Sequence, residues 1–213
     1  MITIACGRDV TNKPKQARRA RRRWCQLVAI GASAGGLAAL TEVIGALEAE
    51  FPAIVIVQHL DPTHKSQLAN VLARKTKKNV KEAEQGELLV RGTIYIGPPD
   101  EHLLVARGRI QLAHSRLIRF SRPSIDMMFG SVAAVYGGKA VGVILSGSNR
   151  DGADGICAIR GAGGITVAQD PATADFRVMP QAAIDTGCVD YVVPIGELGK
   201  LLSKLYLEGR PAK

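Results

Sequence analysis

The stretch that decides the fold covers residues 26–40 and reads QLVAIGASAGGLAAL. Residues 27–30 are all apolar, as in a buried strand, and residues 31–36 are small, which is typical of a tight turn. From Leu37 onward, apolar residues recur at the spacing of a helix. The stretch therefore predicts a strand, a sharp turn and a helix, with Ser33 in the turn.

Ser33 stands at the centre of a G-x-S-x-G pattern. In a strand-turn-helix context this pattern is typical of a nucleophile elbow, because small neighbours let the chain turn sharply and lift the hydroxyl above the sheet. A dinucleotide-binding loop would need a glycine where Ser33 stands, so that match is poor. Ser33 could instead be the N-cap of the helix, and the stretch alone does not decide between capping and catalysis.

Composition places the chain among single-domain α/β proteins. It has 213 residues, of which 46% are apolar and only 4% aromatic. The net charge of +9 is concentrated at one end, since residues 1–25 carry +7 and residues 26–213 only +2. We therefore expect a disordered basic tail over residues 1–25 and one folded domain over residues 26–213.

A signal peptide, a membrane span and a nucleic-acid-binding or membrane-binding tail are all disfavoured by the sequence. A secretory signal peptide is disfavoured, because three glycines interrupt the apolar run that follows the basic residues. No eighteen consecutive apolar residues occur, so no membrane insertion is expected. Contact with nucleic acid or an anionic membrane is not expected either, because Trp24 is the only aromatic residue in the tail and no recognition fold follows.

The cysteines and histidines indicate no cofactor and no metal. Cys6, Cys25, Cys157 and Cys188 are widely separated and form no C-x-x-C pair, which predicts reduced structural thiols in a cytoplasmic protein. His102 and His114 flank an expected hairpin, and their spacing matches no metal-ligand set. We expect both to be partly exposed strand residues.

The rest of the chain alternates strands with helices, which predicts a doubly wound, mostly parallel sheet with one antiparallel hairpin. The expected strands cover residues 27–30, 53–57, 92–97, 140–145, 165–169 and 189–193, the hairpin residues 103–113, and the main helices residues 37–47, 66–75, 127–136, 153–161, 181–186 and 195–207. Ser124 is expected to cap the helix over residues 127–136. His59 follows the second strand, and Asp151 lies in the loop after the strand over residues 140–145.

Ser33, His59 and Asp151 thus follow three strands, and the carboxyl ends of such strands are where open α/β sheets bind ligands. The three residue types suit a nucleophile, its general base and the group that orients the base. Histidine could take the proton of serine and later return it to the leaving group. The chain order Ser, His, Asp differs from that of the α/β-hydrolases, so the elbow does not imply that fold.

Over residues 27–202 the sequence closely resembles the catalytic domain of the chemotaxis protein-glutamate methylesterases, the CheB family. The resemblance rests on motifs that occur in the family's order: GASAGG, VIVQH, YIGPPDEHLLV, RPSID, VGVILSGSNRDGADG, AQD and VMPQAAIDTG. It implies a catalytic triad of Ser33, His59 and Asp151. It also implies, as substrates, methylated glutamyl side chains on the cytoplasmic helices of chemoreceptors, with deamidation of certain glutamines.

Two positions depart from the family's pattern. The residue after the nucleophile is Ala34 instead of threonine, and the loop usually written G-M-G-N-D-G reads GSNRDG over residues 147–152. Backbone amides of Ala34 and Ser148 could still form an oxyanion hole, because that role needs no side chain. Arg150 could bind acidic surroundings of the substrate, crowd the site or point into solvent.

Family members commonly carry an N-terminal receiver domain, for which residues 1–25 are too short. We therefore expect either a constitutively open site or control by a separate regulatory protein. Two other functions stay open: an esterase or amidase for another substrate with the same triad, and a non-catalytic binding module of the same fold.

Overall fold

The computed structural model describes residues 25–48, 50–60, 66–76 and 78–208. The expected basic tail lies outside these residues, apart from Cys25. The strands are β1 (Leu27–Ala32), β2 (Ala53–Gln58), β3 (Asn79–Glu82), β4 (Thr93–Ile96), β5 (His102–Ala106), β6 (Arg109–Ala113), β7 (Ala140–Ile144), β8 (Ile165–Gln169) and β9 (Tyr191–Val193). The helices are α1 (Gly36–Gly45), α2 (Leu68–Lys75), α3 (Ile125–Tyr136), α4 (Ala153–Gly161), α5 (Val178–Asp185) and α6 (Ile195–Glu208), with short 3-10 turns at Gly137–Lys139 and Pro171–Thr173.

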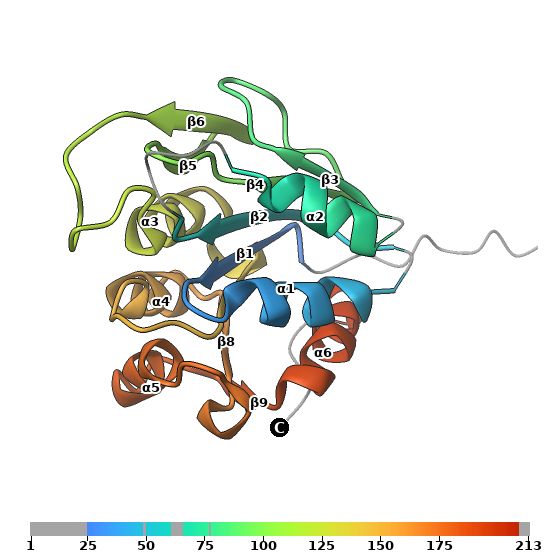
Figure 1. Ribbon diagram of the computed structural model, residues 1–213, viewed down its shortest axis with the longest axis vertical. Coiled ribbons are helices and arrows are strands. Elements are labelled where there is room, and N and C mark those ends of the chain that lie inside the picture. Colours follow the sequence, from blue (N-terminus) through green and yellow to red (C-terminus); the bar gives the residue numbers. More distant parts are fainter. Residues whose placement is uncertain (1–24, 49, 61–65, 77, 209–213) are drawn as a thin grey trace, which may run out of the picture.

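In the described part of the chain, the main sheet has seven parallel strands in the order β3-β4-β2-β1-β7-β8-β9. Strands β5 and β6 form a separate antiparallel hairpin. The fold is therefore the doubly wound α/β sheet with a hairpin that the sequence predicts. Figure 1 shows the strands with helices on both sides.

Two hydrophobic cores lie on opposite faces of the sheet, because successive side chains of a strand point to opposite faces. In β1, Val28 and Ile30 belong to the core under α1, α2 and α6. Leu27 and Ala29 belong to the core under α3, α4, α5 and the hairpin. The helices α3, α4 and α5 stack along the left of Figure 1, whereas α1 and α6 lie together at the right. Both faces are covered, so the central strands are apolar throughout.

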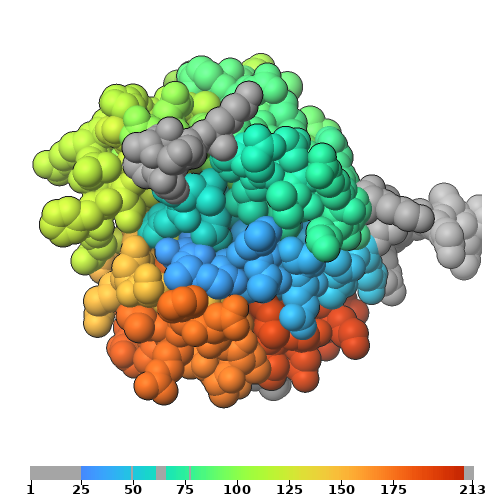
Figure 2. All heavy atoms as spheres, in the orientation of Figure 1, coloured from blue at the N-terminus to red at the C-terminus, as the bar shows by residue number. Residues whose placement is uncertain are grey.

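The strand order reverses its direction between β1 and β7. On one side of β1 lie β2, β4 and β3, and on the other side lie β7, β8 and β9. In Figure 2 the blue β1–α1 stretch lies between the green part of the molecule above it and the orange and red C-terminal part below it. The carboxyl ends of strands at such a switch point border a crevice where open α/β sheets bind ligands.

The structure corrects three sequence-based expectations. Cys157 and Cys188 form a disulfide instead of staying reduced, because α4 and the segment after α5 bring their Cα atoms to 5.1 Å. Helix α5 begins at Val178, not at residue 181, because Pro180 falls in its first turn, where proline is tolerated. His102 is fully buried and not partly exposed, while His114 is exposed as expected.

No helix among the described residues is both long enough and apolar enough to cross a membrane.

Candidate active site

The turn after β1 carries Ser33 and is held by two neighbouring strand ends. The Ser33 amide donates to the carbonyl of Ser146 after β7, at 2.9 Å, and the His59 amide donates to the carbonyl of Ala32 at 3.1 Å. Ser146 Oγ donates to the Ala34 carbonyl at 2.8 Å. The ends of β1, β2 and β7 are thereby fastened together around the turn.

Glycines make this turn possible. Gly35 is the N-cap of α1 and has φ 73°, a left-handed conformation that favours glycine. A Cβ atom at Gly36 would lie 1.9 Å from Gln58 Oε1. No side chain caps α1, so the alternative in which Ser33 acts as the helix N-cap is wrong.

Gln58, at the end of β2, joins the turn of Ser33 to the backbone of His59. Its Nε2 donates to the Ser33 carbonyl at 2.7 Å and to the His59 carbonyl at 3.0 Å. The side chain is buried, and its Oε1 has no hydrogen-bond partner within the described residues. Gln58 directly precedes His59 in the sequence, but the two hydrogen bonds of its side chain become visible only in the folded chain.

His59 lies beside Asp151. Its Nε2 is 2.9 Å from Asp151 Oδ2, and its side chain is 14% exposed, while that of Asp151 is fully buried. Ser33 and His59 line the same cavity of about 430 Å³. The structure therefore brings the three residues predicted from the sequence to one edge of the sheet.

Asp151 lies at the N-terminus of α3, where free backbone N–H groups favour a negative charge. Its Oδ2 accepts from the Ile125 amide at 2.7 Å, and its Oδ1 accepts from the Asp126 amide and from Ser124 Oγ, both at 3.1 Å. Burial raises the pKa of Asp151, but the hydrogen bonds from His59, Ile125 and Asp126 outweigh it and lower that pKa below its usual value. Asp151 is therefore held as a carboxylate.

Ser124 has two roles. It is the N-cap of α3, as predicted, since its Oγ accepts from the Met127 amide. The same Oγ donates to Asp151, a contact that no sequence pattern indicates because residues 124 and 151 meet only in the folded chain. Its amide donates to Nδ1 of the buried His102 at 3.1 Å. Ser124 therefore links the start of α3 to the carboxylate beside His59.

One wall of the cavity is apolar. It is formed by Leu117 and Phe120, and Phe120 is 97% exposed. Phe120 has φ 63° in a turn closed by two backbone hydrogen bonds between Ile118 and Ser121. The Arg122 guanidinium anchors the turn on Asp100. A bulky residue in a left-handed conformation is uncommon, so the surrounding contacts hold Phe120 at the rim of the cavity.

The two oxyanion-hole candidates are the backbone amides of Ala34, in the turn after β1, and of Ser148, in the loop after β7. Within the described residues, neither the Ala34 amide nor the Ser148 amide donates a hydrogen bond to another group. Their role stays a prediction. No group of three His, Cys, Asp or Glu side chains in the described part of the chain could hold a metal ion.

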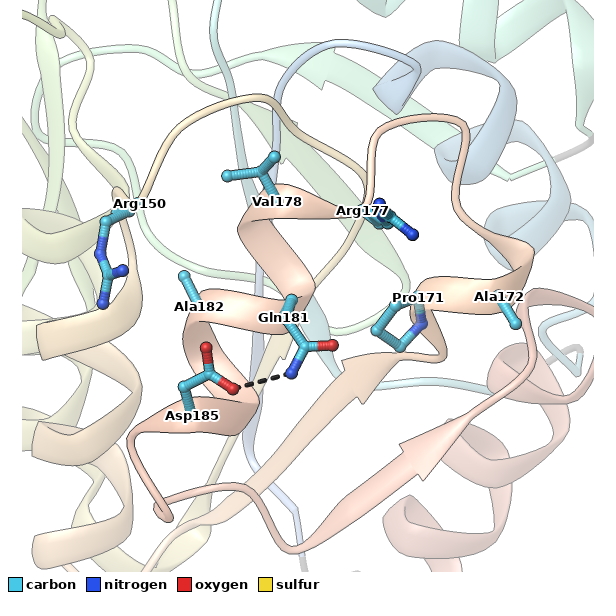
Figure 3. A pocket seen from close by; sticks show the side chains of 8 residues that line it. All are labelled: Arg150, Pro171, Ala172, Arg177, Val178, Gln181, Ala182 and Asp185. Carbon is cyan, nitrogen blue, oxygen red and sulfur yellow. Dashed lines mark hydrogen bonds between the residues drawn. The ribbon is translucent and has the colours of Figure 1, made fainter.

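Arg150 lies in another hollow. Its neighbour Asn149 lines the cavity of Ser33, whereas Arg150 lines an adjacent hollow of about 580 Å³ along α5. Figure 3 shows Arg150 on one flank of α5 and Arg177 near the start of that helix. The role of Arg150 in substrate binding stays a prediction, and any such contact would lie beside the cavity of Ser33.

Comparison with known proteins shows the same domain over most of the chain. Residues 28–202 match the family model described as CheB methylesterase. A relative from Leptospira interrogans is 37% identical over 182 residues, which are 84% of this chain and 94% of that protein. The protein-glutamate methylesterase/protein-glutamine glutaminase 2 of Anaeromyxobacter dehalogenans is 39% identical over 90% of this chain, which matches 56% of that relative.

A solved structure agrees with the fold. The crystal structure of the Thermotoga maritima CheB methylesterase catalytic domain matches with a TM-score of 0.81 and 35% sequence identity, over 85% of this chain and 98% of that one.

Proposed function

Because this chain belongs to the CheB methylesterase family, we propose that it hydrolyses methyl esters of glutamyl side chains on chemoreceptor helices through Ser33, His59 and Asp151. The observation that carries this proposal is the hydrogen bond between His59 and the buried Asp151, beside the cavity that Ser33 shares. Serine needs such a base, because its hydroxyl is a poor nucleophile at neutral pH.

The hydrogen bonds of His59 assign its two nitrogens. The Asp151 carboxylate can only accept, so Nε2 carries the proton of the neutral imidazole and Nδ1 carries a lone pair. As Ser33 Oγ attacks the ester carbonyl carbon, its proton passes to Nδ1. The carboxylate of Asp151 then offsets the positive charge of the imidazolium.

The attack produces a tetrahedral intermediate with a negatively charged oxygen. The backbone amides of Ala34 and Ser148 would donate to that oxygen, and donors fixed in the backbone would lower the barrier. Neither donor depends on its side chain. The departures from the family's pattern at these two positions therefore leave the oxyanion hole possible.

The intermediate then collapses. The bond between the carbonyl carbon and the methoxy oxygen breaks, and methanol leaves with the proton from His59 Nδ1. A water molecule next attacks the acyl-serine ester, again with His59 as base, and releases the glutamyl carboxylate and Ser33. With a glutamine side chain the leaving group is ammonia, so the same steps would also deamidate glutamine.

The proposed partners and compartment follow from this reaction. Methylated side chains would enter the cavity of Ser33 from receptor helices, whose methylated segments lie in the cytoplasm. The ester methyl group would contact the apolar wall of Leu117 and Phe120.

Methanol release from a methylated receptor fragment tests the proposal. Wild-type protein should release methanol and leave a free glutamyl carboxylate, visible by mass spectrometry, while Ser33→Ala should release almost none. Hydrolysis of small esters without release from the receptor would indicate an esterase for another substrate. Absence of both activities in folded protein would favour a binding module.

A further inference from the structure

Asn149 contacts the nitrogen of His59 that the proposed reaction uses. Its Nδ2 lies 3.2 Å from His59 Nδ1, on the opposite side of the imidazole from Asp151. Asn149 directly follows Ser148 in the loop over residues 147–152.

The orientation of the Asn149 amide is determined by its other hydrogen bond. Asn149 Oδ1 accepts from the backbone amide of Asp151 at 3.0 Å. A flipped side chain would set its NH₂ group against that N–H and its oxygen against the lone pair of Nδ1. The NH₂ group therefore points to Nδ1 and donates to the lone pair of the neutral imidazole.

This contact conflicts with catalysis. The lone pair on Nδ1 has to take the proton of Ser33, and the described residues offer it the Asn149 amide as a hydrogen-bond donor. Once Nδ1 is protonated, both it and the Asn149 NH₂ group are donors, so the contact is lost. An interaction that is stronger in the ground state than in the transition state raises the barrier.

We propose that Asn149 restrains the general base: its amide occupies His59 Nδ1 in the resting enzyme and has to be displaced before Ser33 can be deprotonated. The inference rests on the proposed triad and adds to it a residue that sets the rate of the reaction. Removing the side chain should raise the reactivity of Ser33 by about 2- to 10-fold, the effect of one neutral hydrogen bond.

The test uses a fluorophosphonate, which reacts with serine only after proton transfer to the base and requires no receptor. We would measure the second-order rate of Ser33 labelling in the full chain by quenching at intervals and mapping the label by mass spectrometry. The variants are Asn149→Gly and Asn149→Ala, which both remove the side-chain amide. The matched control is Asn70→Ala on the exposed face of α2, whose side-chain amide donates to Gln67 Oε1 at 2.9 Å.

A second measurement separates the proposed restraint from a structural role. The ¹⁵N resonance of His59 Nδ1 should move in both Asn149 variants, because a hydrogen bond to its lone pair is lost, and should stay in place in Asn70→Ala.

Faster labelling in the Asn149 variants together with a moved Nδ1 resonance would support the restraint. Unchanged or slower labelling in folded Asn149→Gly and Asn149→Ala would overturn it, and so would an unmoved resonance. If the reagent does not label Ser33 even in the wild type, the proposed triad fails and the inference fails with it. Normal Ser33 labelling with no effect of Asn149 would remove the restraint alone.

Discussion

Two hollows flank the loop after β7, and consecutive residues of that loop face different ones. Asn149 lines the cavity of Ser33 and His59, of about 430 Å³, while Arg150 lines the hollow along α5, of about 580 Å³. At the smaller cavity, Asn149 contacts His59, and His59 in turn contacts the buried carboxylate of Asp151. In the larger hollow, the hydrogen bond drawn in Figure 3 joins Gln181 to Asp185 within α5.

The larger of these two hollows is therefore not the one that holds the candidate catalytic residues. The larger hollow along α5, the arginine hollow, is lined by two exposed arginines, Arg150 and Arg177. It has no base beside a nucleophile. The cavity of Ser33 is lined by a serine and a histidine, and that histidine contacts the buried carboxylate of Asp151, which is held ionised. We therefore expect substitutions in the arginine hollow to change chiefly substrate binding and protein stability. Substitutions in the cavity of Ser33 should change the rate of the reaction.

The largest effect should come from the proposed triad. Ser33→Ala and His59→Ala should each lower kcat by ~10³-fold or more, and the double variant should lose little beyond that, because the residues act as a unit. The measurement is methanol release, with melting temperature as the control for folding. Retention of most of the activity by Ser33→Ala would refute the mechanism.

The next effect should come from the disulfide between Cys157 and Cys188. It links α4 to the segment after α5, the helix that lines the arginine hollow. Cys157→Ser should lower the free energy of unfolding by ~3–4 kcal/mol, because a cross-link between residues 31 apart restricts the unfolded chain. Denaturant unfolding with and without reductant checks this. The activity of folded Cys157→Ser should stay at the wild-type level, and a stability that does not respond to reductant would contradict the linkage.

A third prediction uses the opposite pKa shifts of two carboxylates near the start of α3. The lowered pKa of Asp151 means that its stabilising contribution is complete above the unfolded value of about 4 and is lost as the pH falls toward its folded pKa. Asp151→Asn should therefore lose less stability on acidification than the wild type.

Asp126→Asn is the matched control for that experiment. Burial raises the pKa of Asp126, so its ionisation opposes folding as the pH rises. Removing this group should make the loss of stability on acidification steeper, the reverse of the effect of Asp151→Asn. Denaturant unfolding between pH 3 and pH 7 measures both, and equal slopes in the two variants would contradict the assignment.

Phe120 should affect substrate binding more than the chemical step. Phe120→Ala should raise KM by about 3- to 10-fold with little change in kcat, because the exposed ring offers apolar contact at the rim and touches no reacting group. Phe120→Leu should recover part of the affinity. A large fall in kcat with an unchanged KM would place the ring in the chemistry instead.

The smallest effect should come from the arginine hollow. Arg150→Ala should raise KM for a methylated receptor by about 3-fold or less, since exposed ion pairs contribute little. The increase should shrink as salt is added, because the charges are screened. Arg177→Ala is the matched control on the opposite flank of the hollow, and an unchanged KM in both variants would remove the hollow from receptor binding.

Sequence patterns were sufficient for the place of three candidate residues and for the order of the elements except β3, a short edge strand with no apolar run. Period-2 and period-3.6 patterns reflect which face of an element is buried, and parallel strands present their carboxyl ends at one edge. His59 and Asp151 could therefore be placed near Ser33 before any contact was known. The early start of α5 escaped prediction because Pro180 is compatible with a first turn as well as with a helix boundary.

The amino-acid pattern is thus enough to predict the parallel α/β sheet and the residue types at its strand ends, because burial patterns are local properties of the chain. Three contacts follow from folding alone: Ser124 donates to Asp151, Cys157 bonds to Cys188, and Asn149 and Arg150 line different hollows. These contacts join residues distant in sequence, or depend on how one loop packs between α3 and α5. No local pattern specifies them, because they follow from the packing of whole elements against each other.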